Sequence, residues 1–217
     1  MPVFLASIVA CALAALISQE LPYAPAELKQ GRPPLIPEEA IGGGEVLVEL
    51  DISEGGAVTR ARPLRTTPPF TAVVMEAVRG WQFAPARELV RASGRSSRNP
   101  VRSSVLVVAV YRPPVLVGPT LGERPKDVSP PSSAVASPSM MPAPPFPPDA
   151  VLGGTVLLEV RVDANGAIEN VAVLQASPPF GDVAAKTVRD WIFRPAQRNG
   201  VRVPATVYVI VGFRAPV

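Results

Sequence analysis

The residue types on which most enzymes and metal sites depend are scarce in this sequence. It contains no histidine and a single cysteine, which removes the usual general base, the usual metal ligand, and any intramolecular disulfide or thiolate zinc site. Catalysis would have to rest on a pair of carboxylates such as Glu49 and Asp51. These two residues alternate with apolar ones and so belong to the solvent face of a strand. We therefore predict that the protein is not an enzyme and that it binds no metal, cofactor or small-molecule substrate.

One stretch imitates the start of a calcium loop. Residues 163–170 read DANGAIEN, yet the remaining ligand spacing, including the glutamate at the twelfth position, does not follow. Gly166 in this stretch and Gly56 in the equivalent stretch SEGGAV are instead suited to the positive φ of a tight turn. The sequence predicts a β-hairpin at each place.

The positive charge of the chain has one concentrated source. The formal net charge is +3, and five arginines surround one Gly/Ser-rich stretch, namely Arg87, Arg91, Arg95, Arg98 and Arg102. Such a stretch fits a solvated loop, or a loop that contacts an anionic envelope surface. No aromatic residues interleave with these arginines to stack on bases, so we do not expect nucleic acid as a partner.

The chain contains one unit twice. WQFAPA at residues 81–86 returns as WIFRPA at residues 191–196, and the match continues without a gap from Gly43 to Ala86 at a shift of 110 (191 − 81). Beyond Ala86 it resumes at a shift of 102, pairing Val101 with Val203, so the first copy has 8 extra residues (110 − 102) in the arginine-bearing loop. Self-similarity of this kind indicates a tandem duplication.

Each copy predicts the element order strand, strand, helix, strand. The first strand alternates apolar and polar residues, at 46–52 and again at 156–162, which is typical of a half-buried strand. After the hairpin, Thr67 or Ser177 precedes Pro-Pro, a pattern expected of a helix N-cap followed by proline at the first helical position. Apolar residues at helical spacing over 70–81 and 180–191 then predict an amphipathic helix.

The repeated W-x-F-x-P phrase is expected to be structural and not a ligand site. Its tryptophan closes the apolar stripe of the helix, its phenylalanine anchors the exit, and its proline prevents the helix from continuing. Aromatic anchors bury about 150–250 Å² each, which matters for a core supplied by about 70 residues. The residues concerned are Trp81, Phe83, Pro85, Trp191, Phe193 and Pro195.

The last strand of each copy, 104–111 and 206–213, is apolar at nearly every position. If all three strands of a copy are antiparallel, the last strand lies beside the first in the order 2-1-3 and forms an edge. An apolar edge is covered, accepts another strand, or aggregates. A second arrangement, in which the two last strands pair with each other, would leave no free edge there.

These features resemble the TonB carboxy-terminal domain family. The resemblance rests most clearly on Gly154, Val156, Leu158, the turn 163–166, Ser177, Arg189, Trp191, Phe193, Pro195 and Ala196, with a less exact first copy. It implies an α+β fold with two β-β-α-β domains, each a three-stranded antiparallel sheet with a helix on one face. These domains would span 41–113 and 149–217, with a Pro-containing linker at 21–40 and a Pro-rich linker at 114–148.

The resemblance also implies a function. Domains of this type dock on extended peptides of outer-membrane transporters by β-strand addition through their last strand. They act as energy transducers in support of transmembrane transport. Other envelope proteins and inner-membrane motor proteins are further expected partners. Carried over to this sequence, the docking residues are Thr206, Val207, Tyr208, Val209, Ile210, Val211 and Phe213, with a second edge at Val105, Val107, Ala109 and Tyr111. The alternative is a periplasmic protein-binding scaffold or adaptor that uses the same fold without proton-motive coupling.

Residues 1–20 predict export. Their apolar run at 3–17 would span roughly 22 Å as a helix, short of the ~30 Å hydrocarbon core. A cleaved signal peptide therefore fits better than a spanning helix, and a short inner-membrane anchor is the alternative. No positive residue precedes the run, which suggests a start further upstream, and Cys11 lies in a stretch shaped like a lipoprotein cleavage box. We expect a periplasmic protein, either released or tethered.

Overall fold

The computed structural model describes residues 22–37, 40, 42–92, 95–112 and 122–214. The predicted signal peptide or anchor at 1–20, including Cys11, lies outside the described residues, as does part of the predicted linker at 114–148. Within the described part of the chain, no helix is long and apolar enough to cross a membrane.

The two copies have the same principal elements in the same order. The first contains β3 (Gly44–Ile52), β4 (Val58–Thr66), α1 (Phe70–Arg79) and β8 (Ser103–Arg112), and the second contains β11 (Gly154–Val162), β12 (Ile168–Ala176), α2 (Phe180–Val188) and β16 (Ala205–Phe213). The tight turns are present, with φ of 88° at Gly56 and 92° at Gly166. The chain is therefore α+β, with mostly strands and two helices.

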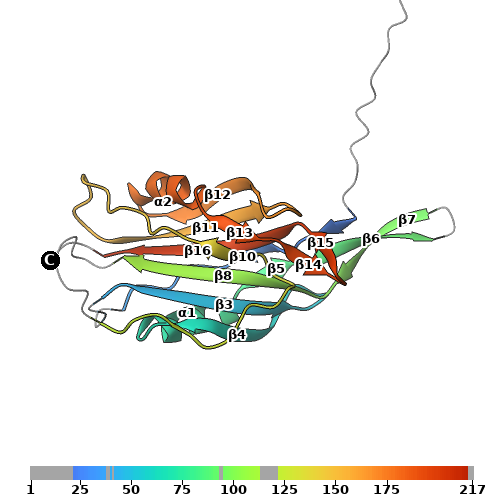
Figure 1. The fold of residues 1–217 in the computed structure, drawn as a ribbon, viewed down its shortest axis with the longest axis horizontal. Coiled ribbons are helices and arrows are strands. Elements are labelled where there is room, and N and C mark those ends of the chain that lie inside the picture. Colours follow the sequence, from blue (N-terminus) through green and yellow to red (C-terminus); the bar gives the residue numbers. More distant parts are fainter. Residues whose placement is uncertain (1–21, 38–39, 41, 93–94, 113–121, 215–217) are drawn as a thin grey trace, which may run out of the picture.

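The principal strands form one sheet and not two. Its order is β12-β11-β16-β8-β3-β4-β9, where β9 is the short strand Lys126–Asp127. The pairs within each copy are antiparallel, whereas β8 and β16 pair in parallel across the middle (Figure 1). The prediction of two separate three-stranded sheets is thus wrong, because the last strands of the two copies join them into a continuous sheet.

Shorter strands form small separate sheets of two or three strands beside the main sheet. They are β1 (Tyr23–Ala24), β2 (Glu27–Gln30), β5 (Gln82–Ala84), β6 (Ala86–Ala92), β7 (Arg95–Val101), β10 (Ser137–Met140), β13 (Ile192–Arg194), β14 (Ala196–Arg198) and β15 (Val201–Val203). The antiparallel pair β6–β7 carries most of the arginines that were expected on a loop, and it projects from one end of the molecule (Figure 1). The 8 extra residues of the first copy therefore lengthen a hairpin.

The two helices cover opposite faces of the sheet. Residues that face each other across a parallel pair point to the same side, and alternate residues point to opposite sides. In β8, Val107 and Ala109 share a core with α1, whereas Leu106 and Val108 share a core with α2. Two hydrophobic cores therefore lie on the two sides of one sheet, and β8 and β16 contribute to both.

Both helices end earlier than the apolar spacing predicts, and both begin two residues after Pro68 and Pro178, the prolines expected at the first helical position. The predicted caps are wrong, because the residues before the first helical turn are Pro69 and Pro179, and neither helix has a side-chain cap hydrogen bond. Thr67 instead ties the start of the helix to the sheet, since its Oγ1 donates to Glu45 O at 2.8 Å and accepts from Glu45 N at 3.1 Å. The tryptophans lie just beyond the helix ends.

Candidate docking site

The strand predicted to dock a partner lies in the middle of the sheet. β16 pairs with β11 on one side and with β8 on the other, and its nine residues are all buried. The prediction that Thr206, Val207, Tyr208, Val209, Ile210, Val211 and Phe213 form a free edge is therefore wrong for this fold.

The second predicted edge is occupied by the same contact. Val105, Val107, Ala109 and Tyr111 lie on β8, which pairs with β3 on one side and with β16 on the other. All four side chains are buried, none more than 2% exposed. The parallel pair, which we call the seam, runs from Val207 opposite Leu106 to Phe213 opposite Arg112.

The apolar character of these strands has a physical reason in the seam. A strand with one face on a core alternates apolar and polar residues, whereas a strand covered on both faces is apolar throughout, as is usual in parallel sheets. β16 reads ATVYVIVGF and β8 reads SSVLVVAVYR. The continuous apolar runs therefore fit two central strands better than two exposed edges.

Two extended segments cover the parts of the sheet that the helices leave bare. We call residues 22–37 the first strap and residues 129–147 the second strap. Each strap pairs with the short strand that follows its own copy's helix, β2 with β5 and β10 with β13. Each also accepts a hydrogen bond from a tryptophan Nε1, from Trp81 to Arg32 O at 3.2 Å and from Trp191 to Pro142 O at 3.0 Å.

The repeated aromatic phrase thus holds the straps. Trp81, Phe83, Trp191 and Phe193 are at most 5% exposed, and both prolines of the phrase, Pro85 and Pro195, are half-buried. The phenylalanines lie on β5 and β13, the strands with which the straps pair. The predicted Pro-rich linker is accordingly a packed part of the fold over its described residues from 129 onward, and not a free spacer.

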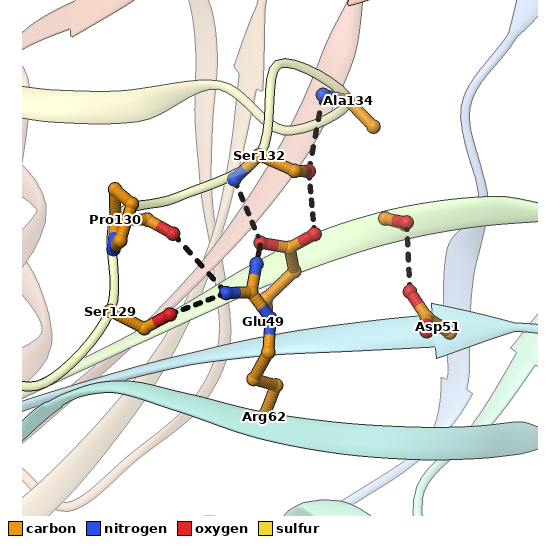
Figure 2. A network of polar contacts seen from close by, with 8 residues as sticks. Glu49, Asp51, Arg62, Ser129, Pro130, Ser132 and Ala134 are labelled. Atoms are coloured by element: carbon orange, nitrogen blue, oxygen red, sulfur yellow. Dashed lines mark hydrogen bonds and ion pairs between the residues drawn. The ribbon is translucent and has the colours of Figure 1, made fainter.

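A buried carboxylate attaches the second strap to the first copy (Figure 2). Glu49, expected on a solvent face, is 5% exposed. Its carboxylate accepts hydrogen bonds from Ser132 Oγ at 2.5 Å, from Ser132 N at 3.0 Å and from Arg62 Nη2 at 2.6 Å. Arg62 Nη1 in turn donates to Ser129 Oγ at 2.7 Å and to Pro130 O at 3.2 Å. The buried charge is therefore paired and hydrogen-bonded.

The equivalent carboxylate of the second copy attaches the first strap by a different route. Tyr208 Oη donates to Glu159 Oε2 at 3.2 Å and accepts from Leu28 N at 2.6 Å. Arg161 bridges Glu159 at 3.2 Å and Glu27 at 2.9 Å. Each strap therefore pairs with a short strand of its own copy and is hydrogen-bonded to the sheet of the other copy. The two copies are thus held together by both straps as well as by the seam.

Two buried tyrosines on the seam differ in their hydroxyl environment. Burial raises the pKa of both Tyr111 and Tyr208, and the Glu159 carboxylate raises the pKa of Tyr208 further. The Tyr208 hydroxyl has two hydrogen-bond partners. The Tyr111 hydroxyl is buried and has no partner in the described part of the chain.

Both members of the carboxylate pair Glu49 and Asp51 hold structural hydrogen bonds. Asp51, the other member of the carboxylate pair, accepts a hydrogen bond from Ser104 Oγ at 3.1 Å, while Glu49 is occupied by the second strap. Among the described residues, no cluster of acidic or cysteine side chains could hold a metal ion.

The straps could have been found in the sequence. The shift of 110 that relates the two copies continues upstream of Gly43, pairing Ala24 with Ala134, Ala26 with Ala136, Pro34 with Pro144, Pro37 with Pro147 and Ala40 with Ala150. Short identities among prolines and alanines are weak evidence on their own. The unbroken register would have shown that the straps belong to the repeated unit.

The carboxy-terminal third of the chain matches a known family. Residues 142–215 match the family model described as Gram-negative bacterial TonB protein C-terminal. The matched range begins in the second strap and includes all principal elements of the second copy. No curated protein matches the chain.

Proposed function

Because residues 142–215 form a domain of the TonB C-terminal family, we propose that the protein is a periplasmic adaptor that binds other envelope proteins and keeps its last strand closed. The family match favours an envelope protein whose domain interacts with outer-membrane transporters. The expected partners are therefore outer-membrane transporters or other envelope proteins.

The seam is the observation that carries this proposal. β16 is paired along both sides and buried on both faces. A partner strand would have to replace the parallel ladder, in which each hydrogen bond contributes about 0.5–1.5 kcal/mol net. It would also have to compensate for the apolar surface of β8 that the exchange exposes. Docking through the last strand is thus opposed by the resting structure.

The energy transducer is the second candidate, and the family match favours it. In that case residues 1–20 would remain embedded in the inner membrane, beside motor partners there, and the seam would open to offer β16 to a transporter. This mechanism makes seam opening a required step, whereas the adaptor binds with the seam closed. The two candidates can therefore be separated by locking the seam.

A reversible disulfide across the seam provides the lock. Leu106 and Val207 face each other in the parallel register and point to the same side of the sheet, so we would replace both with cysteine in a Cys11→Ser background. Full-length protein would be titrated with extended peptides from the periplasm-facing ends of outer-membrane transporters of the same organism. The oxidised and reduced forms of the same protein serve as matched samples.

The adaptor proposal predicts equal affinity in the two forms. Binding that disappears on oxidation and returns on reduction would overturn it in favour of the transducer. Absence of binding in both forms would contradict a role in recognising these transporter segments.

A further inference from the structure

The two outermost principal strands of the sheet, β4 and β12, occupy equivalent positions in the two copies but differ as edges. Their residues correspond at the shift of 110, so Val58 corresponds to Ile168 and Thr66 to Ala176. Each pairs on its inner side with the first strand of its copy. The chain therefore contains an internal comparison of one edge with the other.

The β4 edge carries several features that prevent strand addition. Pro63 has no N–H to donate to an added strand, and three arginines lie along β4. β9 pairs with its carboxy-terminal end, and Val128 N donates to Leu64 O at 2.8 Å just beyond that pair. The β4 edge is therefore protected by its own proline and arginines and by the segment that pairs with its carboxy-terminal end.

The β12 edge carries none of these features. Its sequence IENVAVLQA contains no proline and one charged residue, Glu169. Within the described residues β12 is the last strand on its side of the sheet. Val173 and Leu174 are 43% and 40% exposed, so apolar side chains lie open beside an unpaired backbone.

A positively charged pocket flanks the carboxy-terminal end of this edge. Lys29 and Arg32 of the first strap line it together with Gln175 of β12, and Gln175 Nε2 donates to Gly31 O at 3.0 Å. Both cations are exposed, and neither has an ion-pair partner among the described residues. On the other side of the sheet, a Cβ at Gly181, at the start of α2, would lie 3.6 Å from Val173 Cγ1, so the glycine leaves this contact with the exposed Val173 side chain unmade.

From this contrast we propose that β12 is the docking strand, and that it pairs with an extended, mainly apolar segment of another envelope protein that carries acidic residues beside Lys29 and Arg32. The backbone ladder supplies affinity, and the alternate side chains supply register and specificity. The proposal rests on the proposed adaptor function and names its site. β12 is the second strand of its copy, so docking there leaves the seam closed.

The first test uses full-length, isotopically labelled protein and two synthetic peptides. Each has about ten residues of alternating valine and threonine, and one carries two terminal glutamates where the other carries two lysines. We expect the glutamate peptide to shift the amides of 168–176 and to bind at least several-fold more tightly than the lysine peptide. The double variant Lys29→Glu/Arg32→Glu should reverse this preference, because both side chains are exposed and their replacement leaves the fold intact.

A second variant copies the natural block of β4 into β12. Pro63 corresponds to Val173, and Pro63 is accommodated in the β3–β4 ladder opposite Val48. Val173→Pro should therefore keep the β11–β12 pair and abolish peptide binding, with the dispersion of the amide spectrum as the check on folding. If this variant does not fold, the charge-reversal pair alone decides the question.

Three outcomes of the first test would overturn the proposal. They are amide shifts concentrated on β8 and β16, no binding of either peptide, and concentration-dependent shifts of β12 without peptide, which would mean that a second copy of the chain occupies the edge. If transporter peptides bind the disulfide-locked protein while β12 stays silent, the adaptor function stands and this site assignment falls.

Discussion

Removing one hydroxyl from the seam gives a sharp test of how the first strap is attached. Tyr208→Phe keeps the ring, which packs edge-on against Trp81 and Phe83 with centroid separations of 5.9 and 5.7 Å. It deletes the oxygen that accepts from Leu28 N and donates to Glu159. A partly buried N–H, that of Leu28, is left without its acceptor, and the buried Glu159 carboxylate loses one donor.

The expected loss in the free energy of unfolding follows from leaving polar groups without hydrogen-bond partners. Leaving one such group unpaired costs about 1–3 kcal/mol. For a chain of this size, each kcal/mol lowers Tm by about 2–4 °C. The measurement is urea unfolding of the full chain followed by tryptophan fluorescence, with the free energy of unfolding taken from the midpoint and slope.

Tyr111→Phe is the matched control. Tyr111 lies on the neighbouring strand, is equally buried, and stacks on Phe70 with a centroid separation of 4.1 Å, but its hydroxyl has no partner among the described residues. Its removal should leave the free energy of unfolding unchanged or raise it. Equal losses from the two variants, or a larger loss from Tyr111→Phe, would refute the assignment of the Leu28–Tyr208–Glu159 connection.

Three further predictions concern the second strap and the second hairpin. Ser132→Ala should lower the free energy of unfolding by about 1.5–3 kcal/mol in urea titrations, because it removes the hydroxyl that donates to the Glu49 carboxylate, whereas the exposed neighbour Ser133→Ala should change it by less than about 0.5 kcal/mol. Gly166→Ala should lower the thermal midpoint by an amount equivalent to about 1–3 kcal/mol, since φ is 92° and the new Cβ would lie 2.5 Å from a backbone carbonyl oxygen; an unchanged midpoint would contradict this geometry. The backbone N–H groups of the hairpin turn, that of Ala167 first, hold the pKa of Asp163 below its ordinary value. The stabilisation that these hydrogen bonds give is therefore present above the unfolded-state pKa of Asp163 and is lost as the pH falls through its folded-state pKa. NMR titration of the carboxyl should give a lowered pKa, and an ordinary value would exclude these hydrogen bonds.

Local structure was predictable wherever a residue's own conformational preference decides it. Gly56 and Gly166 marked the hairpins because an L side chain is strained at their positive φ. Period-two alternation marked β3 and β11, since each has one face on its own copy's core. Apolar spacing predicted both helices, although Pro69 and Pro179 occupy the N-cap positions, so the helices begin at Phe70 and Phe180.

Long-range pairing was not predictable in the same way. The order 2-1-3 within each copy is correct, but the pattern within one copy cannot say what lies beyond its last strand. The absence of alternation in β8 and β16 was the available signal, and it favours strands buried on both faces. The solvent-face assignment of Glu49 failed for the same reason, because a distant segment covers it through Ser132.

The most direct test of the seam is amide hydrogen exchange of the full-length protein without any peptide. A strand at a sheet edge protects only alternate amides, whereas a strand paired on both sides protects nearly all of them. We predict protection at nearly every amide of 104–111 and 206–213. Alternating protection in either strand would show that the two last strands are not paired, and would return β16 to the role of an open docking edge.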